Sequence, residues 1–596
     1  MQELHVASDI TTLTQTNVAD YVFDNARKTP SNIALRRRID GVWSDVTAEQ
    51  FAAEVTAVAK GLIAAGIAPG DRVAVTSKTR YEWTVVDIAI LTVGGVVVPI
   101  YETSSAEQIE WILTDSGARA AFVETPTHQV SLESVRIKAP TLTQVWQFDA
   151  GGLDTVAGLG TEVSDDEVIT RRRGRSLDDL ASIIYTSGTT GRPKGASITH
   201  GNFVNEVEEV LSVLKSFFNI GTSTLLFLPV AHVFGRVIEL GALASGCTLG
   251  HSPDVKNLLD DLAGFKPTFL LAVPRVFEKV YNGAKQKAHG SGKGKIFDLA
   301  ESVAIKYSQA TEKGSAPILL KLQHTIFDHL VYSKLRAALG GNTIAAISGG
   351  APLGPRLGHF FRGLGVTIYE GYGLTETTAA VTVNNPEAIR IGTVGRPIPG
   401  TTARVAEDGE LIFKSPVVFA GYWQNDTATK ESIDDEGWFH TGDIGEIDAD
   451  GFVKITGRKK ELIVTAGGKN VAPAVLEDRV RAHWLVSQCL VVGDQQPFIA
   501  ALVTIDPESF PAWLEQNGLP ATTTVAEVAD NAALKAEIQA AIDDANKAVS
   551  HAESIRKFTI LPIDWTEDGG QVTPSMKLKR NVVSKEHAAE IEELFS

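Results

Sequence analysis

The sequence has few cysteines, fewer basic than acidic residues and no long apolar run. Its two cysteines, Cys247 and Cys489, are far apart, which excludes a disulfide framework and zinc-ligand spacing and fits a reducing compartment. The 55 Lys and Arg against 72 Asp and Glu give a formal net charge of -17, which repels phosphate backbones. We therefore expect neither a zinc site nor a nucleic-acid partner.

Membrane-spanning and export signals are also missing. The N-terminal residues include Glu3 and Asp9 and lack a basic segment followed by an apolar one, so we expect no signal peptide and a cytoplasmic protein. The longest uncharged apolar stretch, 88–101, is too short to span a bilayer and contains Gly94, Gly95 and Pro99. It predicts a buried helix end, a glycine turn and a buried strand.

The length predicts at least two domains, because single cores stop growing at roughly 250 to 300 residues and this chain has 596. After Gly457 the sequence becomes a compact segment with its own apolar strands and a long helical pattern over 524–548. We therefore predict a large domain over 1–457 and a small domain over 458–596.

Helices alternate with short strands rich in Val, Ile and Leu. Thr47 and Gln50 form a capping-box pattern, and the apolar spacing that follows predicts a helix as far as Gly66. Turns then lead into RVAVTS, AAFVE and FLLAVP, which read as strands. These steps predict an α/β protein with largely parallel sheets. Residues 151–179 are expected to form a solvated connecting loop, and 285–316 an exposed insertion around helical pieces.

The first chemical motif is YTSGTTGRPKG, residues 185–195, which follows the apolar strand ASII. Three glycines, four hydroxyls and Lys194 bring backbone N–H donors and one cation to a small volume, which is typical of a phosphate-binding loop. The loop does not match the Walker pattern, and ASITH after it reads as a second strand. A plain glycine-rich hairpin is the alternative.

The second motif is a pair of strands that each run into a glycine turn, SGGAPLG (348–354) and IYEGYGLTET (368–377). Ligands of α/β sheets bind at such strand ends. Tyr372 could stack on a purine, and Thr375 with Glu376 could hold a phosphate oxygen and Mg2+. Alone, Glu376 is more often a surface or helix-capping acid.

Two further motifs lie near the predicted domain boundary and the C-terminus. In EGWFHTGDIGEIDADGFVKITGRKKELI (436–463), Asp443 of a TGD turn could accept ribose hydroxyls, and Arg458 could neutralise phosphate. In PSMKLKR (574–580), Lys577 lies in a basic cluster. Taken singly, these are a turn-forming Asp and a solvated loop.

The four segments, in this order and at these intervals, resemble the adenylate-forming superfamily, which includes acyl-CoA synthetases, firefly luciferase and the adenylation domains of peptide synthetases. The resemblance covers nearly the whole chain, and VPRVFEK (273–279) with KITGRKK is most similar to the bacterial long-chain fatty acyl-CoA synthetases. It implies a large N-terminal domain of stacked α/β subdomains and a smaller mobile α+β C-terminal domain.

The resemblance implies a role for each matching residue. The phosphate loop matches Thr186, Ser187, Gly188, Thr189, Thr190 and Lys194, and the phosphate and Mg2+ pair matches Thr375 and Glu376. The adenine pocket matches Gly349, Gly350, Ala351, Pro352, Tyr372 and Gly373, and the ribose contacts match Asp443 and Arg458. The remaining matches are Lys577 as the lysine that bridges carboxylate and α-phosphate, Lys460 as the hinge, His232 near the acyl carboxylate, and Gly467 and Gly468 beside a pantetheine channel.

Three features qualify the match. Met576 stands where the family often has glycine before the catalytic lysine, and Gly457 stands where the long-chain signature commonly has Asp. A satisfied buried histidine is an alternative for His232. None of these removes a reacting group.

The implied activity uses ATP and Mg2+ to convert a fatty acid to an acyl-adenylate with release of pyrophosphate, and then forms a thioester with CoA. Three alternatives stay open: a fatty acyl-AMP ligase that delivers to a carrier protein, a synthetase for aryl or short-chain acids, and a nucleotide-binding regulator. Only residues 578–596 follow Lys577, so a fused carrier is not expected. Peripheral contact with the inner membrane is a hypothesis based on the lipid substrate. Motifs report neither acyl chain length nor oligomeric state.

Overall fold

The helix-turn-strand steps of the N-terminal third form a seven-stranded sheet with the order β19-β9-β8-β5-β4-β6-β7. The computed structural model describes residues 2–10, 13, 15–186, 192–567, 569–573 and 577–596. Strands β8, β5, β4, β6 and β7 are parallel, whereas β9 pairs with β8 and β19 with β9 in antiparallel fashion. The strand bounds are β4 (Arg72–Thr76), β5 (Val96–Ile100), β6 (Ala120–Val123), β7 (Gln144–Gln147), β8 (Leu180–Thr186), β9 (Lys194–Thr199) and β19 (Gly421–Tyr422).

The predicted local signals are confirmed in this region. Helix α2 (Ala48–Ala64) begins at the Thr47 capping box, and Phe51 and Val55 on its apolar stripe are buried. The apolar stretch 88–101 is the end of α3 (Tyr81–Thr92), a glycine turn and the buried strand β5. Other helices here are α1 (Asp20–Lys28), α4 (Ala106–Ser116), α5 (Pro126–Val135), α8 (His200–Leu214) and α9 (Val233–Ser245).

The prediction of a solvated loop over 151–179 is wrong. The segment contains helices α6 (Gly152–Leu159) and α7 (Asp165–Arg173). Helix α6 packs so closely on α2 that a Cβ added to Gly61 would lie 1.9 Å from the Val156 carbonyl oxygen. Close backbone contact through glycine needs few large apolar side chains, and for that reason the low apolar density of this segment was misleading.

Two more sheets are formed by strands of the large unit within residues 33–397. One has the order β12-β13-β14-β15-β16 and the other β10-β11-β2-β3. Strands β12 to β14 are parallel, and β14 then pairs antiparallel with β15. Their bounds are β2 (Ile33–Ile39), β3 (Val42–Thr47), β10 (Ser223–Leu226), β11 (Thr248–His251), β12 (Phe269–Ala272), β13 (Ala345–Ser348), β14 (Thr367–Leu374), β15 (Ala379–Val383) and β16 (Arg396–Pro397). The intervening helices are α10 (Leu258–Phe265), α11 (Pro274–Gly290), α12 (Gly294–Glu312), α13 (Ile318–Phe327), α14 (Ser333–Ala338) and α15 (Pro355–Gly363).

The expectation of largely parallel sheets fails for the segment before residue 458. A five-stranded sheet of order β1-β17-β18-β20-β21 is antiparallel throughout. Gly409 and Gly451, both with φ of 85°, turn the chain between neighbouring strands, and such short turns join only antiparallel pairs. The bounds are β1 (Gln2–His5), β17 (Thr402–Val405), β18 (Glu410–Lys414), β20 (Phe439–Ile447) and β21 (Val453–Arg458).

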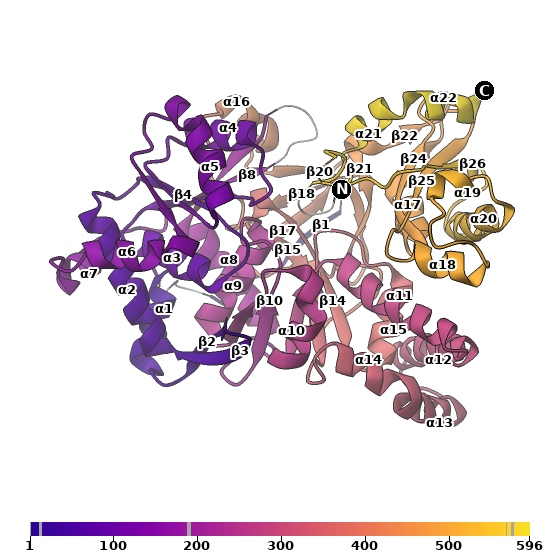
Figure 1. Ribbon diagram of the computed structural model, residues 1–596, viewed down its shortest axis with the longest axis horizontal. Coiled ribbons are helices and arrows are strands. Elements are labelled where there is room, and N and C mark those ends of the chain that lie inside the picture. Colours follow the sequence, from indigo (N-terminus) through magenta and orange to yellow (C-terminus); the bar gives the residue numbers. More distant parts are fainter. Residues whose placement is uncertain (1, 11–12, 14, 187–191, 568, 574–576) are drawn as a thin grey trace.

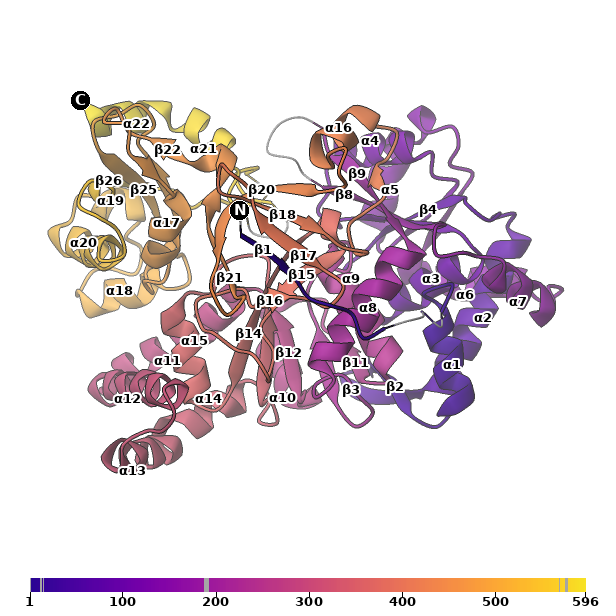
Figure 2. The same cartoon turned by 180° about the vertical axis from the view of Figure 1, so that it is seen from behind.

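The C-terminal part forms a smaller α+β unit, drawn in orange and yellow beside the large one (Figures 1 and 2). Its strands are β22 (Ile463–Val464), β23 (Asn470–Val471), β24 (Val486–Val492), β25 (Ile499–Ile505) and β26 (Ile555–Ile560). Its helices are α17 (Pro473–Arg481), α18 (Phe510–Gln516), α19 (Val525–Val528), α20 (Ala532–Asn546), α21 (Arg580–Glu586) and α22 (Ala588–Phe595). The helical pattern predicted over 524–548 is therefore two helices.

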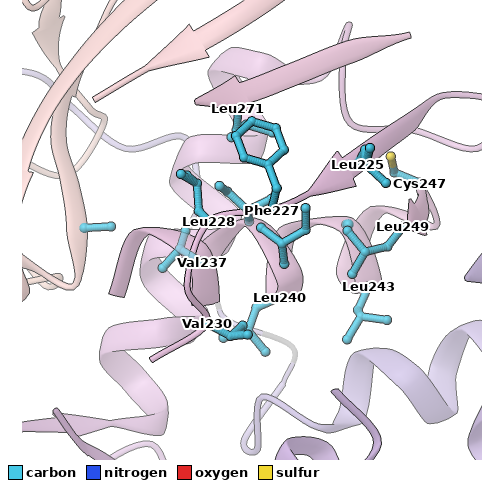
Figure 3. Close-up of a cluster of buried hydrophobic side chains, with 14 of the residues drawn as sticks. Leu225, Phe227, Leu228, Val230, Val237, Leu240, Leu243, Cys247, Leu249 and Leu271 are labelled. Atoms are coloured by element: carbon cyan, nitrogen blue, oxygen red, sulfur yellow. The ribbon is translucent and has the colours of Figure 1, made fainter. Parts of the chain in front are cut away.

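The buried apolar side chains form separate clusters in the two units. The largest extends from Val18 to Phe439, and two others lie within 463–560 and 490–594. Among the described residues, no buried cluster combines side chains from before Gly457 with side chains from after it. Figure 3 shows part of the largest cluster, where Leu240 and Leu243 of α9 pack beside β10 and β11.

A buried ion pair fixes α9 against the seven-stranded sheet. Arg236 of α9 donates from Nη2 to Asp87 of α3 at 2.5 Å and from Nη1 to the Ser182 hydroxyl of β8 at 2.6 Å. Both charged side chains are completely buried. The bridge connects α9 to the strand that leads into the proposed phosphate loop.

We predict that Asp87→Asn lowers the free energy of unfolding by about 3 to 5 kcal/mol, because it leaves a buried guanidinium without its counter-ion. Urea denaturation measures this. The matched control is Glu446→Gln, which breaks the exposed 3.0 Å pair with Lys454 and should change the free energy by less than about 0.5 kcal/mol. Equal effects of the two substitutions would contradict the prediction.

Candidate active site

The motif at 185–195 connects the antiparallel strands β8 and β9, as predicted. Thr186 ends β8 and is the register partner of Lys194, which begins β9. The connection between them therefore starts and finishes at the same end of this strand pair. Ser187, Gly188, Thr189 and Thr190 lie outside the described residues.

A tyrosine that the motifs did not identify joins two of the predicted site residues. Tyr422 of β19 donates its hydroxyl to Glu376 Oε1 at 2.7 Å. The Lys194 ammonium lies 5.1 Å from the centre of the Tyr422 ring, within cation–π distance. The cation of the loop motif and the carboxylate of the second motif therefore both contact one aromatic side chain.

Glu376 follows an unusually close backbone contact. Strand β14 continues through the glycines that were predicted to form a turn, and the turn comes at η5 (Thr375–Thr377). A Cβ on Gly373 would lie 1.4 Å from the Ala379 carbonyl oxygen, so only glycine fits there. The neighbouring Thr378 has a φ of 55°, a region that costs a non-glycine residue energy and is enriched at functional sites. This geometry holds Glu376 at the end of the sheet.

The predicted adenine loop lies at the carboxyl end of β13. Gly350, Ala351 and Pro352 are exposed, and Gly350 has a φ of 82°. The buried Glu370 carboxylate of β14 accepts the Leu353 backbone N–H at 3.0 Å and so holds the end of the loop. Burial raises the pKa of Glu370 to about 7. No sequence spacing identified this residue.

The predicted ribose residues are cross-strand neighbours. Asp443 of β20 and Arg458 of β21 are register partners, and Arg458 Nε donates to Asp443 Oδ1 at 2.8 Å. The Tyr372 hydroxyl donates to the other Asp443 oxygen at 2.5 Å. Burial and, to a lesser extent, the negative charge of Asp443 raise the pKa of Tyr372 well above its ordinary value, so the phenol stays protonated. The predicted TGD turn is wrong, because Asp443 lies inside a strand.

Lys577 lies close to the residues of the large unit. Its ammonium group interacts electrostatically with Arg458, Asp443, Glu376 and Glu461. Part of the residue is accessible to solvent, but the surrounding protein and the Arg458 charge together lower its pKa. The preceding residues 574–576, which include Met576, lie outside the described part of the chain. Three of the four motifs therefore meet at Lys577.

His232 caps the first turn of α9, and its Nδ1 accepts the Phe234 backbone N–H at 3.1 Å. Desolvation and the charge of Lys577 lower its pKa to about 4. The imidazole is therefore neutral near pH 7 and carries its proton on Nε2. A Cβ on Gly349 of the adenine loop would lie 3.6 Å from Cζ of Phe234, which brings the start of α9 beside that loop.

The predicted hinge and channel residues belong to exposed segments. Lys460 is in the short helix η6 (Lys459–Glu461), directly after β21. Gly467 and Gly468 form the exposed turn between β22 and β23, where Gly468 has a φ of 77°. The Ala466 N–H donates to Gln496 of the small unit at 2.9 Å. Neither glycine meets the residues around Lys577 within the described contacts.

Polar contacts along one face of α11 join the two units. Arg275 Nη2 lies 3.4 Å from Asp506 Oδ2, and Lys279 Nζ lies 2.9 Å from Glu508 Oε1. Two helical turns further on, Gln286 donates to the Ser509 hydroxyl at 2.7 Å. Two of these residues belong to the VPRVFEK motif. They contact the small unit directly before α18.

The residues present suit a magnesium ion held mainly by substrate phosphates. Among the described residues there is no group of three or more His, Cys, Asp or Glu side chains that could hold a metal ion. Glu376 Oε1 accepts from Tyr422, which leaves Oε2 available. Mg2+ commonly binds one or two carboxylates together with nucleotide phosphates, and a single carboxylate fits that mode.

The chain matches two family models over most of its length. Residues 22–423 match the model of the AMP-binding enzyme, and residues 460–596 match the AMP-binding enzyme C-terminal domain. The chain belongs to the AMP-binding enzyme family. The four motifs of the sequence lie within these two matches, except the segment around Asp443 and Arg458, which falls mostly between them.

Relatives within the AMP-binding enzymes cover the whole chain. The long-chain-fatty-acid–CoA ligase FadD15 of Mycobacterium bovis is 52% identical over 599 aligned positions, with 100% of both chains covered. Its counterpart from Mycobacterium tuberculosis is 51% identical with the same coverage. The long-chain-fatty-acid–CoA ligase ACSBG2 of Xenopus laevis is 29% identical over 99% of this chain and 85% of its own.

Solved structures of AMP-binding enzymes share the fold. The anthranilate CoA ligase AuaEII, solved with anthranoyl-AMP, has a TM-score of 0.74 at 20% identity and covers 97% of this chain and 99% of its own. The adenylation domain of a Mycobacterium chelonae carboxylate reductase has a TM-score of 0.75 at 23% identity, with coverage of 99% and 93%. The predicted fold class, a large N-terminal and a smaller C-terminal domain, is confirmed. In the part of the chain that the structure describes, no helix is long and apolar enough to cross a membrane.

We predict that Glu370→Gln removes a pH dependence of stability. The pKa of Glu370 is raised from 4.5 to about 7 in the folded protein. Between these values the folded state keeps a proton that the unfolded state loses, so the contribution of Glu370 to stability falls as pH rises. At about pH 8.5 the variant should be more stable than the wild type by about 1 to 3 kcal/mol.

The measurement is urea unfolding at about pH 5 and about pH 8.5. At the lower pH the two proteins should differ little, because glutamine resembles the protonated acid. The control is Glu387→Gln, an exposed carboxyl in the same unit, for which no such difference is expected. A variant less stable than the wild type at the higher pH would refute the assignment.

Proposed function

We propose that the protein is a long-chain fatty acid–CoA ligase that uses ATP to form an acyl-adenylate and then transfers the acyl group to CoA. The observation that carries the proposal is the position of Lys577, whose ammonium interacts with Glu376 of one motif and Asp443 of another. The full-length similarity to the mycobacterial ligases supports the long-chain acid and CoA as substrates.

The first half-reaction joins the fatty acid to AMP. A carboxylate resists attack by a thiol because it is anionic and lacks a good leaving group. In the proposed step, its oxygen attacks the α-phosphate of ATP and pyrophosphate leaves. Lys577 and Lys194 reduce the charge repulsion between carboxylate and phosphate, and the Thr186 hydroxyl and Thr375 orient phosphate oxygens. Ser187, Gly188, Thr189 and Thr190 are proposed to add further donors from the loop.

Binding of the nucleotide is assigned to the neighbouring strand ends. Gly349, Gly350, Ala351 and Pro352 are proposed to border the adenine with Tyr372 and Gly373. Asp443 is proposed to accept the ribose hydroxyls and Arg458 to bond the sugar or a phosphate. Magnesium, when bound to Glu376 and the phosphates, supplies charge neutralisation. His232, neutral near pH 7, is proposed to contact the fatty acid near its carboxylate through Nε2.

The second half-reaction requires a different position of the small domain. We place the domain boundary after Gly457 and the hinge at Lys460. Rotation there withdraws Lys577 and brings Gly467 and Gly468 toward a pantetheine channel, where the CoA thiolate displaces AMP. The exposed turn at 466–470, held within the small unit, is available for such a new contact. We propose that the arrangement described above is the one used in the first half-reaction.

The alternative acceptor is a carrier protein, and the alternative substrates are aryl or short-chain acids. Both share the adenylation step, so the residues around Lys577 do not separate them. A nucleotide-binding regulator would not need Glu376 or Lys577 near the same site. Because a long acyl chain partitions into bilayers, we also propose that a cytoplasmic enzyme makes peripheral contact with the inner membrane.

We predict that Lys577→Ala slows acyl-AMP formation by about 100-fold or more, because it removes a cation from the developing charge. Formation of the thioester from supplied acyl-AMP and CoA should change by less than about threefold, because Lys577 is proposed to act in one step only. The control is Lys579→Ala, two residues away. Equal loss of both half-reactions would refute the assignment.

The same assay tests which acid and which acyl acceptor the protein uses. AMP release is measured with acids from acetate to oleate, with and without CoA. Turnover that needs CoA and favours long acids supports the proposal. Adenylate that accumulates regardless of CoA would indicate a carrier-protein ligase, preference for short or aryl acids would refute the long-chain assignment, and no AMP with any acid would leave nucleotide binding alone.

We predict that Lys279→Glu slows acyl-AMP formation about 2- to 10-fold by replacing an attraction between the units with a repulsion. The 2.9 Å pair with Glu508 is solvent-exposed, so the effect is small. Thioester formation from supplied acyl-AMP should not slow. The exchanged pair, Lys279→Glu with Glu508→Lys, should restore adenylation. Failure of the exchange to restore it would contradict a role in holding the adenylating arrangement.

A further inference from the structure

Helices α12 and α13 project from one corner of the molecule in both views (Figures 1 and 2). We call residues 294–332, which comprise α12, α13 and the π-helix η4 (Asp328–Tyr332), the arm. Its inner side is firmly anchored. A Cβ on Gly363 of α15 would lie 2.2 Å from the Ala304 carbonyl oxygen of α12, and Phe297 is buried beneath.

The outer side of α13 is apolar. Ile318, Leu322, Ile326 and Leu330 recur every four residues, and Leu319 lies beside them. Ile318 is 87% exposed and Leu319 is 68% exposed. With Ile296 and Leu299 of α12, the arm contains seven of the seventeen exposed large hydrophobic side chains among the described residues. Single exposed side chains are ordinary, but a stripe indicates a contact surface.

The inner side of α13 holds the helix in place without using this stripe. The His324 ring stacks on Tyr307 at 3.9 Å between ring centres and contacts the Gly363 carbonyl oxygen at 2.5 Å. Phe327 is buried and Leu320 packs against the main core. The helix is therefore held by one face, and its apolar outer face does not contribute to that packing.

The arm has four lysines and four acids, but the wider segment that contains it is basic in an acidic protein. Residues 285–340 contain nine Lys and Arg against four Asp and Glu, leaving 46 against 68 in the rest of the chain. The four acids all face cations, as Glu301 pairs with Arg356 and Asp328 with Arg336. Asp298 lies 3.8 Å from Lys285, and Glu312 lies 3.8 Å from Arg362.

The lysines of the arm, in contrast, have no carboxylate partner among the described residues. The arm lysines Lys295, Lys306, Lys313 and Lys321 are all exposed, and so is Lys293, which directly precedes the arm. Lys295 lies next to Ile296, and Lys321 lies next to Leu322 and one turn from Ile318. The unopposed positive charges therefore border the apolar stripe.

We propose that the outer face of the arm docks on the surface of an anionic lipid bilayer. An amphipathic helix with apolar residues on one side and lysines at its border lies in the interface plane, with the apolar side among the acyl chains and the ammonium groups at the headgroups. Anionic lipids attract the lysines, and the acidic remainder of the protein is repelled, so only the arm makes contact.

A second copy of the chain fits this face less well. In a twofold-symmetric dimer the same surface patch meets itself, so the unpaired lysines of the two arms would face each other. Like charges across an interface oppose association. The benefit to the enzyme, access to fatty acids dissolved in the membrane, rests on the proposed function, whereas the docking itself does not.

The test is flotation of the full-length protein with two kinds of vesicle, phosphatidylcholine alone and phosphatidylcholine with about 30% phosphatidylglycerol. We expect about tenfold more protein on the anionic vesicles, falling steeply at about 0.5 M salt. The apolar variant Ile318→Ser/Leu322→Ser/Ile326→Ser should reduce binding about tenfold. Its control is Val130→Ser/Ile137→Ser, which removes exposed apolar side chains on another surface.

The charge is tested in the same way. Lys295→Gln/Lys313→Gln/Lys321→Gln should reduce binding about tenfold, whereas Lys28→Gln/Lys138→Gln/Lys454→Gln makes the same change in net charge elsewhere and should have little effect. A tryptophan at position 322, made as Leu322→Trp, should show a blue-shifted emission with anionic vesicles, and Val130→Trp should not.

Several outcomes would overturn the proposal. One is absence of binding to anionic vesicles, and another is equal binding by the wild type and both arm variants. A concentration-dependent dimer in light scattering that the apolar variant abolishes, without vesicle binding, would assign the face to a second copy. AMP formation with a long-chain acid in solution without vesicles should be unchanged in the arm variants, so failure of docking is distinguishable from failure of the proposed activity.

Discussion

The buried carboxylate of Asp443 is the interaction on which the site depends. A buried charge is stable only when both oxygens have partners, and here one accepts from Tyr372 and the other from Arg458. Tyr372 belongs to the strand that ends at Glu376, and Arg458 is the last residue of β21 before the short helix that contains Lys460. One side chain therefore joins a central sheet, the antiparallel sheet and the start of the small unit.

The cations of this site lie in a protein whose formal net charge is -17. Burial and the like charge of Arg458 lower the pKa of Lys577, and the carboxylates of Asp443, Glu376 and Glu461 only partly compensate. A ligand that carries several negative charges would relieve this repulsion and favour the charged form of the lysine. The site is therefore better suited to a nucleoside triphosphate together with a carboxylic acid than to either ligand alone. The overall acidity of the chain and its local anion site do not conflict, because charge is effective only within about a Debye length of its position.

The sequence predicted the parts of the fold that depend on neighbouring residues. The Thr47 capping box, the buried strand of 88–101 and the β8–β9 hairpin around the glycine-rich loop depend on short-range rules, and all are present. The missed features depend on contacts between distant segments. Tyr422 hydrogen-bonds to Glu376, which lies 46 positions earlier in the sequence, and the residues next to Tyr422 in the sequence do not indicate a site. Likewise, α6 could not be recognised by apolar density, because its contact with α2 uses backbone rather than large side chains.

Contacts between the two units along α11 are polar, which agrees with the proposed rotation of the small domain. The buried clusters of the described residues stay within one unit or the other, so separating the units exposes no shared core. Polar pairs along α11 join them; Lys279–Glu508 is the most exposed, with side chains 52% and 68% exposed, whereas Arg275–Asp506 is 29% and 14% exposed. Such pairs contribute about 0 to 1 kcal/mol each, enough to bias an equilibrium and too little to lock it. In the proposed mechanism, a large apolar interface would hold Lys577 permanently in place, and Gly467 and Gly468 could not replace it. Weak contacts between the units are therefore what the proposed two-step reaction requires, because in it one lysine has to leave.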